Sequence, residues 1–543
     1  KSSSRQGAIR GRLTTDDGQP IIKATVNVSA VRNTRGVGRV VGVEEDGRFE
    51  VDGLAPGLYR LFVSAPGYAN PFNPSDRRLY RPGDFASIKL ARGGVITGTV
   101  STFTGEPVVA LPVRAIRIRD EEGRPLRFPG GGGARQTDDR GVYRLYGLQP
   151  GSYLIATGSA YPLTPTQFSD YGEHSPTYYP SATRDTAVEV AVRSGQEISG
   201  VDIRYRAERG YSISGKVMGN IPGAGMGGAS VMLRQVSGGL TQNMQIFPAQ
   251  GNAHSFAIHG VADGEYEITA RSVAQSSEEA ASPARQVTVK GADVTGLELT
   301  LAPLGSVIGR IVVETPPSPC KKDRMPVAEE ILLTALQDRS KDEVRRVSES
   351  AADEKNEFTL RSLEAATYRF DFNLPDVWYV RAITLPSTAG AKKPIDAARD
   401  GVAIKSGQKI TGLVITVAEG AASLSGRIVA EKENDPLPAR TRLYLVPAEK
   451  EQADNLLRYG EVIVKSDGVF AFTNVAPGRY RLLARAIADD ELSSDLRPAA
   501  WDVQSRRKLL VEAETTGTVI ELKPCQKAVD YLLRFPSTAN KSS

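Results

Sequence analysis

The stretch DGRFEVDGLAPGLYRLFVSAPGY, residues 46–68, predicts the fold because it encodes two strands joined by a corner. Phe49 and Val51 alternate with charged residues, and this period of two places apolar side chains on one face of a strand. The Leu-Ala-Pro-Gly segment that follows turns the chain, since proline fixes one backbone dihedral and glycine can adopt a positive one. Alternation resumes at Tyr59, so we expect a second strand facing the same core.

The same pattern returns four times. Four of the five copies keep Gly-x-Tyr at the corner, whereas the fourth has Ala366 and Tyr368, so its turn is expected to be built differently. The four later copies are residues 141–156, 255–270, 357–372 and 467–484. A second repeated signal precedes each copy, a short alternating strand with a central glycine. These strands read IRGRL, ITGTV, ISGKV, VIGRI and LSGRI, with glycines Gly11, Gly98, Gly215, Gly309 and Gly426.

A repeat of roughly a hundred residues is a whole domain rather than a short solenoid unit. The chain of 543 residues is several times longer than an ordinary domain, and its hydrophobic content of 40% is sufficient for several modest cores. We therefore predict an all-β fold, a tandem array of about five seven-stranded antiparallel β-sandwiches. The expected boundaries are 1–93, 94–207, 208–303, 304–419 and 420–525, followed by a tail, 526–543.

Charge and hydropathy exclude some partners. The 68 basic and 63 acidic residues are well mixed along the chain, and no basic tract is interleaved with aromatic residues, so we expect no nucleic-acid binding. No apolar run is long enough to span a membrane. The sequence begins at Lys1 without methionine, and for an all-β repeat array this favours an extracellular or cell-surface protein after removal of a signal peptide.

One long segment of the second domain, residues 161–183, concentrates aromatic residues among prolines and polar residues. Long loops of this kind often carry function. The segment is the candidate ligand or partner surface; the alternative is that its rings cover an open edge of their own sandwich. The aromatic residues are Tyr161, Phe168, Tyr171, Tyr178 and Tyr179.

The opening strand with its glycine, the Asp-Gly turn and the G-L-x-P-G-x-Y corner resemble the carboxypeptidase regulatory-like domain, a transthyretin-like, Ig-like β-sandwich. The resemblance covers nearly the whole chain except the tail and is looser in the fourth domain. Tyr178-Tyr179-Pro180 and the strands after it look like large multi-repeat secreted proteins of soil bacteria. The resemblance implies a sandwich scaffold, extracellular or attached to the bacterial envelope, without catalytic activity of its own.

The residues themselves also argue against an enzyme. The three histidines, His174, His254 and His259, lie in no H-x-x-E or H-E-x-x-H setting, so a zinc peptidase site is not predicted. His254 and His259 are five residues apart and would point to opposite faces of an ideal strand. No nucleophile elbow or phosphate-binding loop occurs. We expect no catalytic residue, no metal and no cofactor.

The two cysteines, Cys320 and Cys525, can close one disulfide in an extracellular protein. In an extended array Cys525 is expected at the far end of the fifth domain, whereas Cys320 is expected near the junction between the fourth and fifth. Cysteine Cα atoms must lie within about 7 Å to be joined. An intrachain bond then requires the fifth domain to fold back; a neighbouring subunit as partner and two free thiols are the alternatives.

Three functions compete. The first is a structural or adhesive array, such as the subunit of a surface filament, that self-associates as a homopolymer. In that case the strand-like tail, with Val529, Tyr531 and Leu533, adds to the sheet of another subunit or packs on its own domain. The second is carbohydrate binding through the aromatic segment, which includes contact with cell-surface polysaccharide. The third is an accessory part of a larger envelope protein. Repetition without reactive chemistry favours the first.

Overall fold

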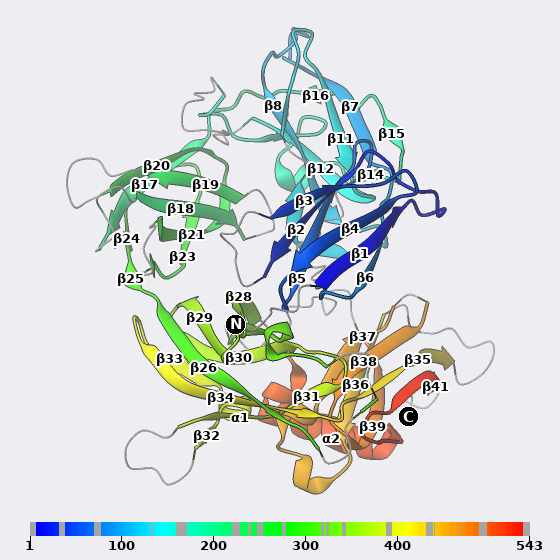
Figure 1. Cartoon of the computed structure of the whole chain (residues 1–543). Helices are drawn as coiled ribbons and strands as arrows, with labels where there is room; N and C mark the ends of the chain where they lie inside the picture. The colour runs from blue at the N-terminus through cyan, green and yellow to red at the C-terminus, as the bar shows by residue number, and fades with distance from the viewer. Residues whose placement is uncertain are drawn as a thin grey trace, which may run out of the picture. The chain divides into compact units, whose positions relative to one another are not determined.

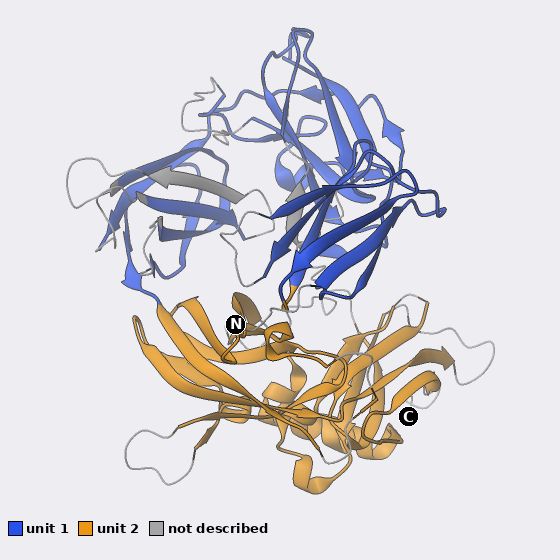
Figure 2. Cartoon of the chain, viewed as in Figure 1, with its two compact units in different colours: residues 1–55, 59–304 blue, residues 56–58, 305–543 orange. Residues whose placement is uncertain are grey.

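The computed structural model forms two compact units, Lys1–Ala55 with Tyr59–Leu304, and Pro56–Leu58 with Gly305–Ser543 (Figure 2). Each unit is described by itself. The structure describes residues 7–31, 38–69, 78–131, 134–158, 171–219, 228–236, 241–246, 254–273, 279–316, 320–321, 325–338, 344–386, 394–430, 438, 440–465, 467–487 and 497–535.

The first unit contains three sandwiches, each made of two sheets (Figure 1). The first sandwich consists of β1 (Gly7–Thr14), β2 (Thr25–Ala30), β3 (Arg39–Gly42), β4 (Arg48–Leu54), β5 (Tyr59–Ser64) and β6 (Phe85–Lys89). The second consists of β7 (Gly94–Ser101), β8 (Pro112–Arg119), β9 (Pro125–Gly131), β10 (Arg135–Gln136), β11 (Val142–Leu148), β12 (Gly151–Thr157), β13 (Thr177–Tyr178), η1 (Arg184–Thr186), β14 (Val190–Val192), β15 (Glu197–Ile198) and β16 (Ile203–Arg204). The third consists of β17 (Tyr211–Met218), β18 (Gly228–Gln235), β19 (Thr241–Ile246), β20 (His254–Val261), β21 (Gly264–Val273), β22 (Ala280–Ala281), β23 (Arg285–Val289), β24 (Val294–Thr300) and β25 (Ala302–Pro303).

The second unit contains the remaining two sandwiches. The fourth consists of β26 (Gly305–Glu314), η2 (Ala328–Glu330), β27 (Leu332–Asp338), β28 (Val344–Ala351), β29 (Glu357–Leu363), β30 (Ala366–Asn373), β31 (Trp378–Leu385), β32 (Ile395–Asp396), α1 (Ala397–Asp400), β33 (Val402–Ile404) and β34 (Lys409–Glu419). The fifth consists of β35 (Ala422–Ala430), β36 (Thr441–Pro447), η3 (Lys450–Gln452), η4 (Leu456–Arg458), β37 (Gly460–Ile463), β38 (Val469–Val475), β39 (Gly478–Ala486), η6 (Ala499–Trp501), α2 (Val503–Thr516), β40 (Thr518–Leu522) and β41 (Lys527–Phe535).

The predicted all-β fold of tandem sandwiches is confirmed, and each sandwich encloses its own apolar core. Its sheets follow one plan: the first strand pairs antiparallel with the strand before the corner and parallel with the last strand. In the first sandwich the order is β4-β1-β6, with β3-β2-β5 as the second sheet. The fifth repeats it as β38-β35-β41 and β37-β36-β39-β40.

This plan explains the glycine at the centre of each first strand. A Cβ atom added at Gly426 would lie 1.9 Å from the backbone oxygen of Tyr531 in β41, and one at Gly98 or Gly215 would lie 2.0 Å from the oxygen of the equivalent strand. At Gly309 an aromatic ring from the pre-corner strand also fills the space, with Phe358 at 2.4 Å. The parallel closing strand therefore packs directly over a residue that can carry no side chain.

The corner tyrosine has the same role in all five copies. Each hydroxyl donates a hydrogen bond to the backbone carbonyl four residues earlier, which fixes the corner against the following strand. The pairs, with donor–acceptor distances, are Tyr59 to Ala55 (2.9 Å), Tyr153 to Gln149 (2.6 Å), Tyr266 to Ala262 (2.8 Å), Tyr368 to Glu364 (2.9 Å) and Tyr480 to Ala476 (2.7 Å). The corner glycines have positive φ angles, whereas Ala366 in the fourth copy does not, yet Tyr368 keeps its bond.

Burial of these tyrosines predicts loss of stability in alkali. Burial raises the pKa of Tyr153 to about 12, and it also raises the pKa of Tyr368. An unfolded tyrosine ionises near pH 10, so the stabilisation is complete below pH 10 and is lost as the pH rises from 10 through the folded pKa. We expect the midpoint of urea unfolding, followed by circular dichroism, to decrease as the pH is raised from 9 to 11.5. The free energy of unfolding falls by at most roughly 1.4 kcal/mol per buried tyrosine and pH unit. Tyr153→Phe should reduce this fall, whereas Phe at the exposed Tyr146 should leave it unchanged. If the urea midpoint decreased equally with pH in both variants, ionisation of the buried Tyr153 would not be the cause.

The sandwiches differ mainly in the segment that follows the corner strand. In the second sandwich this segment contains β13, which pairs with β12. In the fourth it contains β31, which pairs with β34 and covers the edge of that sheet (Figure 1). In the fifth it contains α2, whose Leu509 and Ala513 pack on Tyr444 and Leu483 of the sheet. In these three sandwiches the segment after the corner strand thus carries an insertion.

The C-terminal tail requires a correction. β41 pairs in parallel with β35 and supplies Leu533 and Phe535 to the fifth core, so it is the closing strand of its own sandwich and not a separate donor strand. Asp530 has a positive φ of 55° at a register shift, and this bulge turns Val529 outward while Tyr531 and Leu533 face inward. The five predicted domain limits remain our proposal, except that the fifth sandwich extends to Phe535.

Candidate functional site

The described part of the aromatic segment, residues 171–183, does not form the expected exposed surface. Tyr161 and Phe168 lie outside the described residues. Tyr171 is half-buried; its hydroxyl donates to the Val109 carbonyl at 2.8 Å, and its ring meets that of Tyr205 edge-on at 5.8 Å. This ring therefore covers its own sandwich.

Tyr178 and Tyr179 also pack inward. Tyr178 is 3% exposed and belongs to a small cluster on the outer face of the sheet, with Ile116, Leu154 and Ala156. Tyr179 packs against the main core of the same sandwich. The prediction that these rings form an exposed ligand surface is wrong, because β13 pairs with β12 and draws both side chains onto the sheet.

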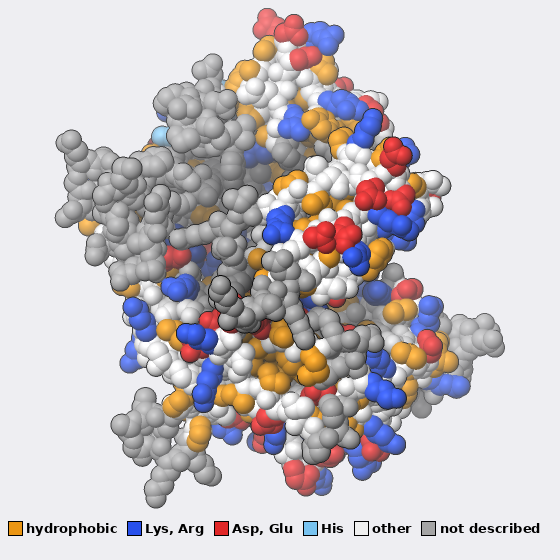
Figure 3. All heavy atoms as spheres, viewed as in Figure 1, with side chains coloured by type: hydrophobic (Ala, Val, Ile, Leu, Met, Phe, Trp, Pro, Cys, Tyr) orange, Lys and Arg blue, Asp and Glu red, His pale blue; other side chains and the backbone are white. Residues whose placement is uncertain are grey.

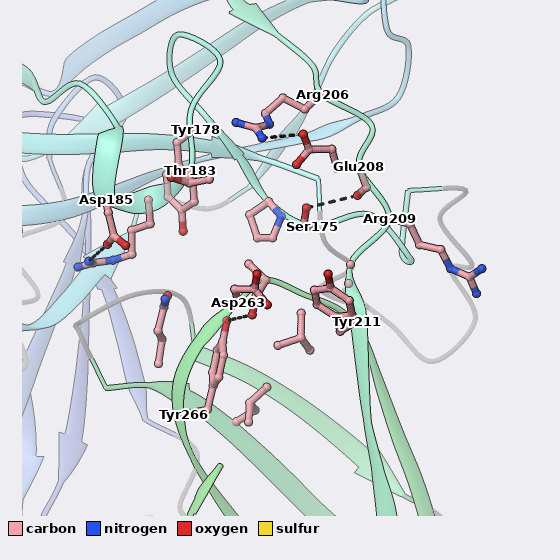
Figure 4. Close-up of a pocket in the computed structure, with 18 residues that line it drawn as sticks. Ser175, Tyr178, Thr183, Asp185, Arg206, Glu208, Arg209, Tyr211, Asp263 and Tyr266 are labelled. Carbon is pink, nitrogen blue, oxygen red and sulfur yellow. Dashed lines mark hydrogen bonds and ion pairs between the residues drawn. The ribbon is translucent and has the colours of Figure 1, made fainter. Parts of the chain in front are cut away.

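Tyr178 instead lines a pocket of about 350 Å³ within the first unit, where the second sandwich meets the third (Figure 4). One wall is the segment that joins the two sandwiches, residues 206–210, which we call the linker. The linker is held to residues 173–177: the Ser175 amide donates to the Glu208 carbonyl at 2.9 Å, and the Gly210 amide donates to the Glu173 carbonyl at 2.8 Å. The opposite wall is the corner of the third sandwich, with Asp263 and Tyr266.

Opposite charges alternate around this pocket. Arg206 pairs with Glu208 at 2.6 Å, and Arg184 lies 3.7 Å from Asp185. Asp263 accepts a hydrogen bond from the Gly291 amide at 2.7 Å. The sequence predicts a domain boundary at the linker and does not predict that it forms part of a site. The charged residues of its Arg-Ala-Glu-Arg stretch are the signal that marks it.

Burial raises the pKa of Tyr178 to about 12, and the neighbouring Arg184 and Arg114 oppose this rise. The hydroxyl therefore remains protonated at neutral pH and can donate a hydrogen bond. Figure 4 shows the Tyr178 and Tyr266 hydroxyls pointing toward each other across the pocket.

Cys320 and Cys525 form a disulfide, with their Cα atoms 5.5 Å apart. The expected position of Cys525, at the far end of the fifth sandwich, is wrong because the last strand is β41. This strand runs parallel to β35, so the turn before it lies where β35 begins, next to the fourth sandwich. The Cys525 amide donates to the Gly420 carbonyl at 3.1 Å, and the Cys320 amide donates to the Glu419 carboxylate at 2.8 Å. No folding back of the fifth sandwich is needed.

Further contacts join the fourth and fifth sandwiches within the second unit. Asp338 accepts two hydrogen bonds from the Arg497 guanidinium, at 2.8 and 3.1 Å. The Asn474 side chain donates to the carbonyls of Pro375 and Trp378, both at 2.8 Å.

Arg369 is held within the fourth sandwich and reaches the fifth through the Trp501 ring. It donates to the carbonyls of Ala398 and Arg399 at 2.7 and 2.8 Å, and its guanidinium lies 5.0 Å from the centre of the Trp501 ring. Burial lowers the pKa of Arg369, while the nearby Asp338 opposes this shift. The junction is therefore held by one covalent bond and several buried or half-buried polar contacts.

The two histidines with described side chains, His174 and His259, have separate surroundings. The His174 ring is hydrogen-bonded to the Tyr205 hydroxyl at 2.7 Å, and His259 is exposed. Within the described ranges, no three His, Cys, Asp or Glu residues are grouped so that they could hold a metal ion. In the same part of the chain, no helix is both long and apolar enough to cross a membrane.

A family model, the carboxypeptidase regulatory-like domain, matches residues 8–73, from β1 to beyond β5. Residues 8–73 form a carboxypeptidase regulatory-like domain. The other four sandwiches repeat the two features that this domain carries, the glycine of the first strand and the corner tyrosine. The resemblance predicted from the motifs is thus confirmed.

No curated protein sequence matches the chain. Among solved structures, the Bacillus anthracis TIE protein is 14% identical in sequence, with a TM-score of 0.15. The match includes 54% of this chain and 50% of the TIE chain. A streptococcal ancillary pilin is 10% identical, with a TM-score of 0.17, and the match includes 55% of this chain and 99% of the pilin chain. Two B repeat units of the collagen-binding protein of Staphylococcus aureus are 10% identical, with a TM-score of 0.15. The match includes 73% of this chain and 93% of the repeat-unit chain.

Proposed function

We propose that this chain is a non-catalytic extracellular protein with a structural or adhesive role, and that it self-associates in a surface filament. The observation that carries the proposal is the junction between the fourth and fifth sandwiches, where a disulfide joins residues 205 positions apart. Disulfides persist in oxidising, extracellular compartments. A covalent bond at a domain junction resists separation of the two domains, which is what a structural array requires.

The free edge of β41 is our candidate for self-association. β41 ends the sheet β38-β35-β41, and it has no second strand partner in the part of the chain that the structure describes. Its outward side chains Val529 and Leu532 are 65% and 67% exposed. In the fourth sandwich, the equivalent strand β34 has its outer edge covered by β31. An unpaired edge with exposed apolar side chains favours pairing with another chain, and here we propose a second copy.

Sedimentation velocity over a range of protein concentrations, with electron microscopy of the same samples, tests this proposal. We expect oligomers or filaments that grow with concentration. The double variant Val529→Lys with Leu532→Lys should shift the population to monomer without lowering the melting temperature, because both side chains face solvent. Met325→Lys, at a position 65% exposed outside any strand, is the matched control and should assemble normally.

Location is tested separately by treating intact producing cells with a protease that cannot enter them. Release of the chain from intact cells supports a surface role. A protein that stays monomeric at every concentration, or that is cleaved only after lysis, would contradict the proposal.

A further inference from the structure

The pocket between the second and third sandwiches has the features of a binding site. Its walls come from four segments: residues 175–185, the linker with the start of β17, two residues of β18 (Leu233 and Gln235), and the corner of the third sandwich (Figure 4). Hydrogen bonds from the linker to Glu173, Ser175 and Thr177 fix two of these segments to each other. The pocket is thus built by ordered backbone, and its volume of about 350 Å³ lies at the small end of the range for ligand sites.

A hydroxyl group points into this pocket. Tyr178 is 3% exposed, and Figure 4 shows its hydroxyl directed into the cavity. Within the described ranges this hydroxyl makes no hydrogen bond to the protein, whereas the corner tyrosine opposite, Tyr266, bonds to the Ala262 carbonyl at 2.8 Å. The Tyr178 hydroxyl is therefore free to donate a hydrogen bond to a ligand in the cavity that supplies an acceptor.

The charges of the lining indicate what kind of ligand fits. Three arginines and three carboxylates line the pocket, and they cancel formally. They are Arg184, Arg206, Arg209, Asp185, Glu208 and Asp263. Two of the arginines are already paired with carboxylates of the same lining. An anion would need a net positive lining and a cation a net negative one, because binding a charge requires compensation for its lost hydration.

A neutral molecule rich in hydroxyl groups matches this lining, since every hydroxyl both donates and accepts hydrogen bonds. The rings of Tyr178, Tyr211 and Tyr266 add apolar surface against which the carbon faces of a sugar ring can pack. We propose that this pocket binds a neutral saccharide of one or two sugar units, with the Tyr178 hydroxyl as a direct donor. This inference goes beyond the structural role, and either can fail without the other.

Isothermal titration calorimetry of the full chain tests the proposal with glucose, galactose, mannose, xylose, N-acetylglucosamine, cellobiose and maltose. Glucuronate and glucosamine serve as charged probes. We expect one bound molecule per chain for at least one neutral sugar, and weaker binding of the matching charged sugar. Tyr178→Phe keeps the buried ring and removes only the donor, so it should weaken binding about tenfold.

Tyr368→Phe is the matched control, because it removes a buried tyrosine hydroxyl from the fourth sandwich and should not change sugar binding. A second variant, Asp263→Asn, keeps an oxygen acceptor for Gly291 but removes one negative charge, so glucuronate should gain affinity relative to glucose. Circular dichroism melting curves confirm that each variant is folded. The proposal is overturned if no neutral sugar of the panel binds, if the charged sugars bind more tightly, or if Tyr178→Phe binds as the unaltered chain does.

Discussion

Replacing Gly426 by alanine is expected to unfold the fifth sandwich under conditions in which the unaltered chain is stable. The new Cβ atom would lie 1.9 Å from the Tyr531 backbone oxygen and 2.9 Å from its Cα atom, so β41 would have to move away from β35. Backbone cannot yield as a flexible side chain does, and overpacking of this kind destabilises by about 3 kcal/mol. The two tryptophans, Trp378 and Trp501, both lie in the second unit, so tryptophan fluorescence during urea unfolding reports this change directly.

Gly42→Ala is the matched control. Gly42 lies in β3, and an added Cβ atom would meet nothing within 4 Å. Glycine is unfavourable within a strand, so this substitution should leave the melting temperature unchanged or raise it slightly, as followed by circular dichroism. Our explanation of the strand glycines would be wrong if the two variants lost equal stability.

Removing the disulfide is expected to have the second large effect. Cys320→Ser with Cys525→Ser opens a loop of 205 positions, for which the chain-entropy treatment gives about 5 kcal/mol as an upper value. Part of the junction remains in the variant, since the Arg497–Asp338 pair and the Asn474 hydrogen bonds do not depend on the cysteines. We therefore expect the tryptophan-detected urea midpoint to fall clearly, and cooperativity between the fourth and fifth sandwiches to weaken.

Reductant provides the internal control for this experiment. Dithiothreitol should lower the midpoint of the unaltered chain toward that of the double serine variant, and it should leave the variant unchanged. Thiol labelling shows whether the disulfide has been reduced. If it has, and the urea midpoint of the unaltered chain stays the same, the disulfide does not stabilise the junction.

The repeated module could be predicted because its signals are local. The corner tyrosine and the alternating strands depend only on residues a few positions apart, and the structure contains them in all five copies. The glycine of the first strand can also be recognised as a repeated residue, but the sequence does not show why this position must be glycine. That reason is a backbone oxygen supplied from about a hundred residues later, and no local pattern contains it.

The misplacement of Cys525 has the same origin. A prediction that separates the tail from the fifth domain places the turn with this cysteine at the wrong end of the sandwich. The tail is predicted as a strand, but the bulge at Asp530 turns Val529 away from the face that Tyr531 and Leu533 share, which the alternation in the sequence does not indicate. Irregular strands of this kind are where periodicity fails as a guide.

The sequence allows two interpretations of the aromatic segment, and the described rings of Tyr171, Tyr178 and Tyr179 follow the second, in which they cover their own sandwich. Proline and polar residues around Tyr178 indicate a loop, and they do not reveal that two residues of that loop pair with β12. Composition identified a segment that contributes to a candidate site, but the pocket depends on a linker and a corner from elsewhere in the chain. Pairing between distant segments decides which side chains are exposed, and local sequence does not encode it.

The parallel pairing of first and last strands also determines when each module becomes complete during synthesis. β35 acquires its partner β41 only after the whole intervening stretch has been made, which gives the module a high contact order and slow closure. Until then one edge of β35 is open to mispairing with a sister module of nearly the same pattern. A ribosome-bound or secreting chain thus passes through five such vulnerable intervals, and a truncation that removes the closing strand would leave its module permanently in that state.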